Sequence, residues 1–127
     1  MTSALVVFLG AGVGGLMRHL ANLAGVRLLG MVEFPYVTMA VNVTGCFVMG
    51  AFTAWFMVKM GAIPQPVRLF LTTGMLGGYT TFSTFSLEFA VLVERGALGY
   101  AAAYALGSLV LCLIAVFAGL FLVRAFS

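Results

Sequence analysis

The chain has 127 residues, of which 64% are hydrophobic and 7% are charged. A soluble domain averages about 25% charged residues, so this composition excludes a protein whose whole surface faces water. The net charge of +3 is small and gives no reason to expect a nucleic-acid partner. We therefore expect a membrane protein in which lipid faces much of the surface.

Four apolar stretches follow one another, over about residues 3–23, 35–58, 66–93 and 97–123. Each can cross a bilayer, because a spanning helix needs about 20 mostly apolar residues. The apolar runs are continuous rather than alternating, which argues against a β-barrel. We predict an all-α membrane protein with four transmembrane helices, in a single transmembrane domain over residues 1–127.

The basic residues are nearly balanced between the two predicted ends of this bundle. One end would carry Lys59, Arg68 and Arg124, and the other Arg27 and Arg95. The positive-inside rule needs a bias to set an orientation. Either a weak bias suffices, or copies insert both ways up and pair as an antiparallel homodimer. Four short helices are few to enclose a pore, which favours an oligomer.

Two glycine pairs have the GxxxG spacing that lets helices approach closely, Gly10 with Gly14 and Gly74 with Gly78. They join copies of the chain, or they pack helices within one chain. The sequence leaves both interpretations open.

The third apolar stretch is unusually polar at mid-span. Residues 72–86 include three glycines and seven Ser or Thr residues. Glycine pairs weaken a helix, and freed backbone groups must be buried in protein or line a wet cavity. We predict a break at GGYTT, residues 77–81, whose carbonyls near Gly77 and Thr80 suit a hard monovalent cation such as Na⁺. The alternative is a packing face with back-bonded Ser and Thr.

Two phenylalanines follow this segment, Phe82 and Phe85, and their spacing places them on one helix face. Lipid or core contact is the usual role of such a pair. Interleaved hydroxyl residues favour a second role, in which the positive ring edges meet a partly dehydrated anion.

Other polar residues fall inside the predicted spans. Asn42 lies one turn after Thr38 and either bonds a neighbouring helix or donates its amide hydrogens to an anion. Arg18 either snorkels to the interface or makes a vestibule electropositive. Glu88 either pairs with Arg18 or lies at a mouth. On the fourth stretch, helical spacing aligns a strip that is polar or simply packed: Tyr104, Ser108 and Cys112.

The sequence contains no catalytic set. Its one histidine, His19, has no partner at triad or metal-ligand spacing, and P-loop and HExxH motifs are absent. Cys46 and Cys112 fall inside predicted spans, where packing residues are expected rather than a disulfide. We predict that the chain is not an enzyme.

Three motifs together resemble the Fluc (CrcB) family of fluoride channels: GGYTTFSTFS at 77–86, TMAVN at 38–42, and Gly14-x-x-x-Arg18. The resemblance implies a fluoride-selective channel that passively exports toxic fluoride across the cytoplasmic (inner) membrane of a bacterium. It implies an antiparallel, dual-topology homodimer with two pores. It also implies a structural Na⁺ at the dimer interface, bound by backbone carbonyls of Gly77 and Thr80.

The same resemblance implies which side chains line the fluoride path: Asn42, Phe82, Phe85 and Tyr104, with hydroxyls from Thr38, Ser83, Ser86 and Ser108. Arg18 and Glu88 match charged positions near the vestibules. The family's hydroxyl strip can continue for two more turns, where this chain has Cys112 and Val116.

The main rival is a proton-coupled exporter of the small multidrug resistance type. Such exporters also have four helices and rely on a membrane-embedded carboxylate in the first helix. Here the first apolar stretch contains no acidic residue, so this alternative fits poorly.

Overall fold

The computed structural model describes residues 2–127, and these are helical apart from short connections. Three helices are long: α1 (Thr2–Leu29), α2 (Tyr36–Lys59) and α6 (Leu98–Ala125). A further rod is interrupted. Its first part joins α3 (Gln65–Leu69), the π-helix η1 (Phe70–Leu76) and α4 (Gly77–Tyr79), and its second part is α5 (Phe82–Glu94). The predicted all-α class is confirmed for these residues.

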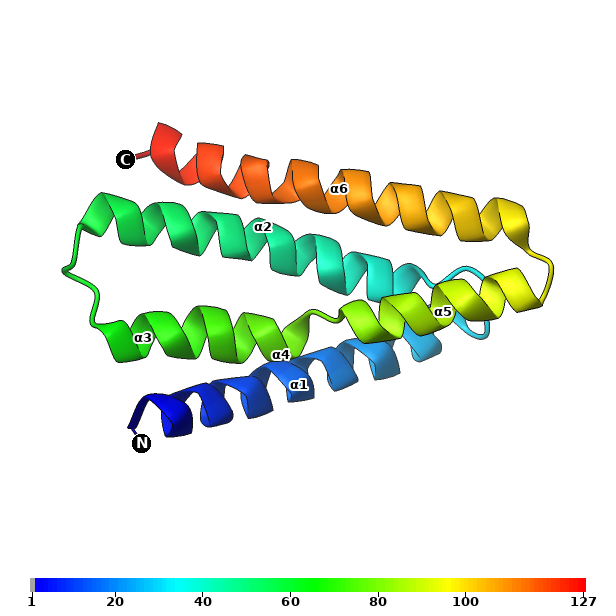
Figure 1. The fold of residues 1–127 in the computed structure, drawn as a ribbon, viewed down its shortest axis with the longest axis horizontal. Coiled ribbons are helices and arrows are strands. Elements are labelled where there is room, and N and C mark those ends of the chain that lie inside the picture. Colours follow the sequence, from blue (N-terminus) through cyan, green and yellow to red (C-terminus); the bar gives the residue numbers. More distant parts are fainter. Residues whose placement is uncertain (1) are drawn as a thin grey trace.

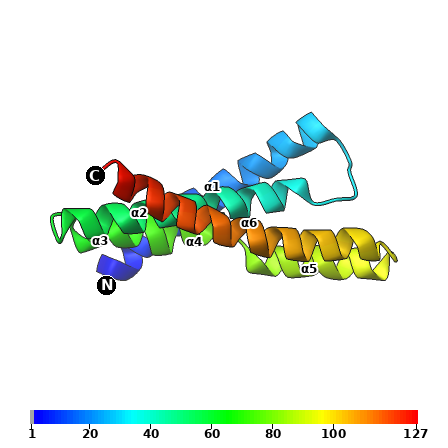
Figure 2. The same cartoon turned by 90° about the horizontal axis from the view of Figure 1, so that it is seen from above.

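Both termini and the α2–α3 connection lie at one end of the molecule, and the α1–α2 and α5–α6 connections lie at the other (Figure 1). Helix α2 packs along α6, whereas α1 packs against η1 and α4. Seen from above, the second half of α1 diverges from the α5–α6 pair (Figure 2). The chain ends and the basic residues of α2, α3 and α6 therefore share one end, as predicted.

Three helices of the described chain, α1, α2 and α6, are long and apolar enough to cross a membrane. Large apolar side chains point outward from them, such as Phe8 at 72%, Phe117 at 67% and Phe121 at 74% exposed. Such a surface is unfavourable in water, and exposed apolar patches of this extent are rare in soluble monomers. The expected membrane protein is confirmed, and the chain is a multi-pass one.

The predicted end of the first helix, at about residue 23, is wrong, because α1 continues to Leu29. Its added residues are mostly apolar, and Arg27 in the last turn complements the negative end of the helix dipole. Gly30 then ends the helix with a positive φ of 72°, the left-handed conformation that glycine adopts at low cost.

Glycines bring α1 and the η1–α4 segment into backbone contact. A Cβ on Gly10 would lie 2.6 Å from the Phe70 carbonyl oxygen, and one on Gly14 would collide with the Met75 carbonyl. On the facing helix, Gly74 and Gly78 meet the backbone of α1 in the same way. The intrachain interpretation of both GxxxG pairs is therefore confirmed.

A second glycine contact holds α2 against α6. A Cβ on Gly50 would collide with the Val116 carbonyl, and one on Gly119 with the Phe47 carbonyl. Near the other end of α6, Leu92, Ala101 and Tyr104 form a buried cluster. These contacts set the register of the residues that face each other across α2, α5 and α6.

Candidate functional site

The interrupted rod breaks at Thr80 and Thr81, whose backbones are extended (φ −81°, ψ 158° and φ −152°, ψ 121°). The predicted break within residues 77–81 is confirmed, and it falls on the last two of them, because Gly77 and Gly78 remain helical in α4. Threonine favours extended backbone, and the Thr81 side chain caps α5 by accepting from the Thr84 N–H at 3.1 Å. Gly78 instead allows α4 to approach α1, because a Cβ there would lie 2.4 Å from the Ala11 carbonyl oxygen.

Asn42 on α2 binds this break with both ends of its amide. Its Nδ2 donates to the Thr81 carbonyl at 3.0 Å, and its Oδ1 accepts from the Thr81 N–H at 2.8 Å. The interhelical hydrogen bond considered for Asn42 is therefore confirmed. The amide has a second Nδ2 hydrogen that these two bonds leave unused, so donation to an anion stays a prediction.

The side chains of Asn42 and Thr81 also leave two backbone carbonyls without the N–H donors that a continuous helix would supply. In a continuous helix the Gly77 and Thr80 carbonyls would accept from the N–H groups of residues 81 and 84. Here those N–H groups donate to Asn42 and to the Thr81 hydroxyl. The break thus leaves carbonyl oxygens at the negative end of α4 and N–H groups at the positive end of α5.

A cavity of about 470 Å³ lies beside the break. Helices α2, α5 and α6 and the extended pair supply its lining: Asn42, Cys46, Thr80, Thr81, Phe82, Phe85, Ala105, Ser108, Leu109 and Cys112. Four of the eight residues predicted for the path therefore meet here, namely Asn42, Phe82, Phe85 and Ser108. Its largely apolar wall carries a few converging polar groups, as small-ligand sites do.

A chain of aromatic rings leads from this cavity into the bundle. The ring centroids of Phe82 and Phe85 are 5.6 Å apart, and those of Phe85 and Tyr104 are 4.9 Å apart. Phe82 is 78% exposed, whereas Tyr104 is fully buried. The pair therefore connects an open surface with an interior polar residue.

Two buried hydroxyls, those of Tyr104 and Ser108, have no hydrogen-bond partner within residues 2–127. The hydroxyl of Thr38, another residue of the predicted path, donates to Glu88 Oε1 at 2.5 Å. Buried polar groups almost always have a partner, so each orphan calls for an explanation such as a water or ion. Both orphans belong to the predicted path.

Thr38 and Glu88 open onto a second cavity, of about 350 Å³, between the end of α1, the start of α2 and α5. Of the two alternatives for Glu88, a mouth position fits this cavity, and its hydrogen-bonding partner is Thr38 rather than Arg18. Arg18 is half-buried on α1 and does not line either of these two cavities. Its vestibule role stays a prediction.

Ser83 and Ser86 are exposed on α5, away from the cavity lining. The Ser86 hydroxyl donates back to the Phe82 carbonyl at 3.0 Å, and that of Ser83 lies 3.3 Å from the Thr81 hydroxyl. Back-bonding, the alternative considered for this segment, thus holds for Ser86 and also for Thr80, which donates to the Leu76 carbonyl.

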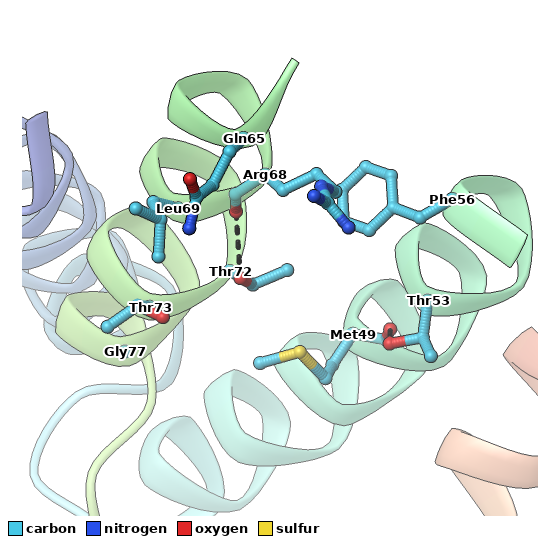
Figure 3. A pocket seen from close by; sticks show the side chains of 9 residues that line it. All are labelled: Met49, Thr53, Phe56, Gln65, Arg68, Leu69, Thr72, Thr73 and Gly77. Carbon is cyan, nitrogen blue, oxygen red and sulfur yellow. Dashed lines mark hydrogen bonds between the residues drawn. The ribbon is translucent and has the colours of Figure 1, made fainter. Parts of the chain in front are cut away.

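A third cavity, of about 560 Å³, separates α2 from the α3–η1 segment and was not anticipated. Figure 3 shows Gln65, Arg68, Thr72 and Thr73 facing Met49, Thr53 and Phe56 across it, with Arg68 extended toward the Phe56 ring. Exposed Gly77 lies at its edge, and a Cβ there would meet only the Thr72 carbonyl oxygen, at 3.8 Å.

The sequence also did not predict Cys46 as part of the lining of the break cavity, although Cys46 lies one turn after Asn42.

Comparison with known proteins gives a consistent result over the whole chain. The family model described as "CrcB-like protein, Camphor Resistance (CrcB)" matches residues 5–120. A protein of Methylobacterium nodulans named "Fluoride-specific ion channel FluC" is 54% identical over 127 residues, covering 100% of both chains. Proteins of the same name from Rhodopseudomonas palustris and Granulibacter bethesdensis are 54% and 51% identical, covering 97% and 98% of this chain and 98% and 96% of theirs.

Proposed function

The chain belongs to the CrcB-like family, and from that premise we propose that it is a fluoride-specific ion channel that exports toxic fluoride passively. Relatives at about half identity and full length carry that name. The observation that carries the proposal here is the cavity at the helix break, which joins the Asn42 amide, the Phe82 and Phe85 rings and the unpartnered Ser108 hydroxyl.

This lining suits a small, strongly hydrated anion. A purely apolar gate would reject fluoride, because removing its water without replacement costs too much free energy. A single fixed positive charge would bind it too tightly to conduct. Amide hydrogens, hydroxyls and ring edges are each weak donors. As fluoride passes Asn42, Phe85, Tyr104 and Ser108, these weak donors replace its water of hydration one step at a time.

The functional unit of the proposal is an antiparallel, dual-topology homodimer with two pores. Each copy crosses the membrane four times, and the interrupted rod of α3, η1, α4 and α5 is the third crossing along the chain. Two observations support the dimer. Phe82 is 78% exposed although it lines the cavity, so a single copy leaves the path open on one side. The basic residues are also nearly balanced between the two ends.

A sodium ion at the dimer interface completes the proposed site, bound by the backbone carbonyls of Gly77 and Thr80 from both copies. These residues fit such an ion, because their carbonyls have lost their helical donors and carbonyl oxygens are ligands for hard cations. No cluster of three or more His, Cys, Asp or Glu suited to a metal occurs within residues 2–127. The ion supplies positive charge between the two negative α4 ends.

The location that fits this role is the cytoplasmic (inner) membrane of a bacterium, where a passive anion path lowers cytoplasmic fluoride. The channel makes and breaks no covalent bonds. The two charged residues predicted for the vestibules, Arg18 and Glu88, would act before and after the narrow path.

Efflux from proteoliposomes tests the proposal. Fluoride should leave rapidly without a proton gradient, and chloride should leave at least tenfold more slowly, a difference of about 1.4 kcal/mol in barrier. Chloride flux equal to that of fluoride would overturn the selectivity, and a strict need for a proton gradient would favour the exporter alternative. Phe82→Ile and Phe85→Ile should each depress fluoride flux with the dimer intact, and unchanged flux in both would reduce the rings to packing.

A further inference from the structure

The chain has two cysteines, and the fold brings them together at the wall of the break cavity. Cys46 lies on α2 and Cys112 on α6, residues that are 66 positions apart in sequence (112 − 46). Both thiols are free and half-buried, and both line the 470 Å³ cavity. They are therefore a facing pair rather than two separate packing residues.

The surrounding packing holds this pair in place. Gly50 on α2 and Gly119 on α6 allow the two backbones to touch, so neither helix can shift without opening these contacts. Cys46 lies one turn before Gly50, and Cys112 lies two turns before Gly119 on a helix that runs parallel to α2. The dithiol is thus preorganised, and a ligand that bridges the two sulfurs pays little for ordering them.

We propose that Cys46 and Cys112 form a two-coordinate site for a soft, thiophilic cation such as Hg²⁺, Ag⁺ or Cu⁺. Thiolates are the ligands that soft metals prefer, whereas Na⁺ prefers oxygen. Two sulfurs suffice for these ions, which accept linear coordination. Structural Zn²⁺ takes four ligands, and residues 2–127 contain no group of three or more His, Cys, Asp or Glu that would supply them.

The binding step involves no oxidation or reduction. Each thiol releases its proton to water, two sulfur–metal bonds form, and the metal gives up two water or weak-anion ligands. The bound ion lies in the same cavity as Ser108 and Phe85. If the cavity is the fluoride path, as proposed above, occupancy of the dithiol blocks flux.

Retention of Hg²⁺ by the purified full-length protein tests the site. We expect one Hg²⁺ per chain, and one equivalent should protect both thiols of the wild-type protein from N-ethylmaleimide, counted by intact mass. Protection of a single thiol per ion would overturn the proposal. This measurement needs no variant and no flux.

Competition with a monothiol distinguishes a bridging ion from one held by a single sulfur. The glutathione concentration that removes half of the Hg²⁺ should be at least tenfold higher for the wild type than for Cys46→Ser or Cys112→Ser, because the second sulfur adds a large effective concentration. Cys46→Ser/Cys112→Ser should retain none. Equal retention by a single variant and the wild type would overturn the site.

Flux measured on the same preparations tests the block. One equivalent of Hg²⁺ should reduce fluoride efflux of the wild type at least tenfold. For each cysteine variant, the efflux rate after addition of Hg²⁺ is compared with the rate of the same variant before addition. Unchanged flux at full Hg²⁺ occupancy would overturn the placement of the site in the path. Absence of fluoride efflux from untreated protein would instead overturn the proposed function.

Discussion

The two halves of the interrupted rod differ in what covers them. The half that ends in α4 has its glycines pressed against α1, where Gly74 and Gly78 meet backbone atoms. The half that begins α5 leaves Phe82, Ser83 and Ser86 exposed. One chain therefore completes the first contact by itself, whereas the second lacks a cover. The comparison indicates that the contact of α1 with η1 and α4 stabilises a single chain, whereas the exposed start of α5 is left for a second copy in the proposed dimer.

The largest effect is expected where α1 touches the rod. In Gly14→Val, the new side chain meets the Met75 carbonyl with no room to move, and overpacking against backbone costs about 3 kcal/mol or more. We expect loss of the folded protein in detergent, measured as its thermal midpoint by size-exclusion chromatography.

The matched control is the neighbouring glycine, Gly15, where a Cβ would meet nothing within 4 Å. Gly15→Ala should keep or raise the thermal midpoint, because alanine is the better helix former. A wild-type midpoint for Gly14→Val would show that the α1 contact is not the stabilising one.

The next effect concerns the break itself. Asn42→Ala removes two hydrogen bonds that hold Thr81 and leaves a half-buried backbone N–H and carbonyl unpaired. Each hydrogen bond contributes about 1 kcal/mol, so we expect a loss of about 2 kcal/mol, with reduced fluoride flux. Thermal midpoint and efflux report the two losses.

Thr53→Ala is the control for Asn42→Ala, because the Thr53 hydroxyl bonds only within its own helix, to the Met49 carbonyl. Its midpoint should remain close to that of the wild type. If Asn42→Ala keeps both its midpoint and its flux, the break is held by something other than this clamp.

How far the sequence predicts the fold can be judged from these same residues. Hydropathy located the membrane stretches, and the density of Ser, Thr and Gly located the break to within a few residues. The residues of this stretch that leave the helix were not predicted, because a glycine that weakens a helix and one that admits a neighbouring helix look alike in sequence. For Gly78, the tertiary contact with Ala11 makes the distinction.

The sequence also did not predict which residues on different helices lie next to each other. Asn42 and Thr81 are far apart in sequence, as are Cys46 and Cys112, and no periodicity within one helix predicts which face meets which. The family motif supplied Asn42 as a path residue, whereas the structure adds its bonds to the break. The cysteine pair had no motif at all.

A smaller effect, confined to flux, is expected from the unpartnered hydroxyl of Tyr104. Tyr104→Phe deletes a buried oxygen that has no hydrogen-bond partner within residues 2–127, so stability should stay the same or rise slightly. If the oxygen serves the anion, fluoride efflux should fall about tenfold, equivalent to about 1.4 kcal/mol. A lower thermal midpoint with unchanged efflux would assign the hydroxyl to packing instead.

The last prediction concerns the ratio of copies in the two membrane orientations, which should be close to one. Basic residues balanced between the two ends predict that copies insert both ways up in similar numbers, and a copy of opposite orientation would then cover the exposed start of α5 at Phe82. In the Cys46→Ala/Cys112→Ala background, Ser127→Cys places a single thiol at the exposed chain end. A membrane-impermeant maleimide should label about half of the molecules in intact cells and all of them after permeabilisation. Labelling of all or none in intact cells would remove the antiparallel dimer, and the cover for Phe82 would then have to come from a copy in the same orientation.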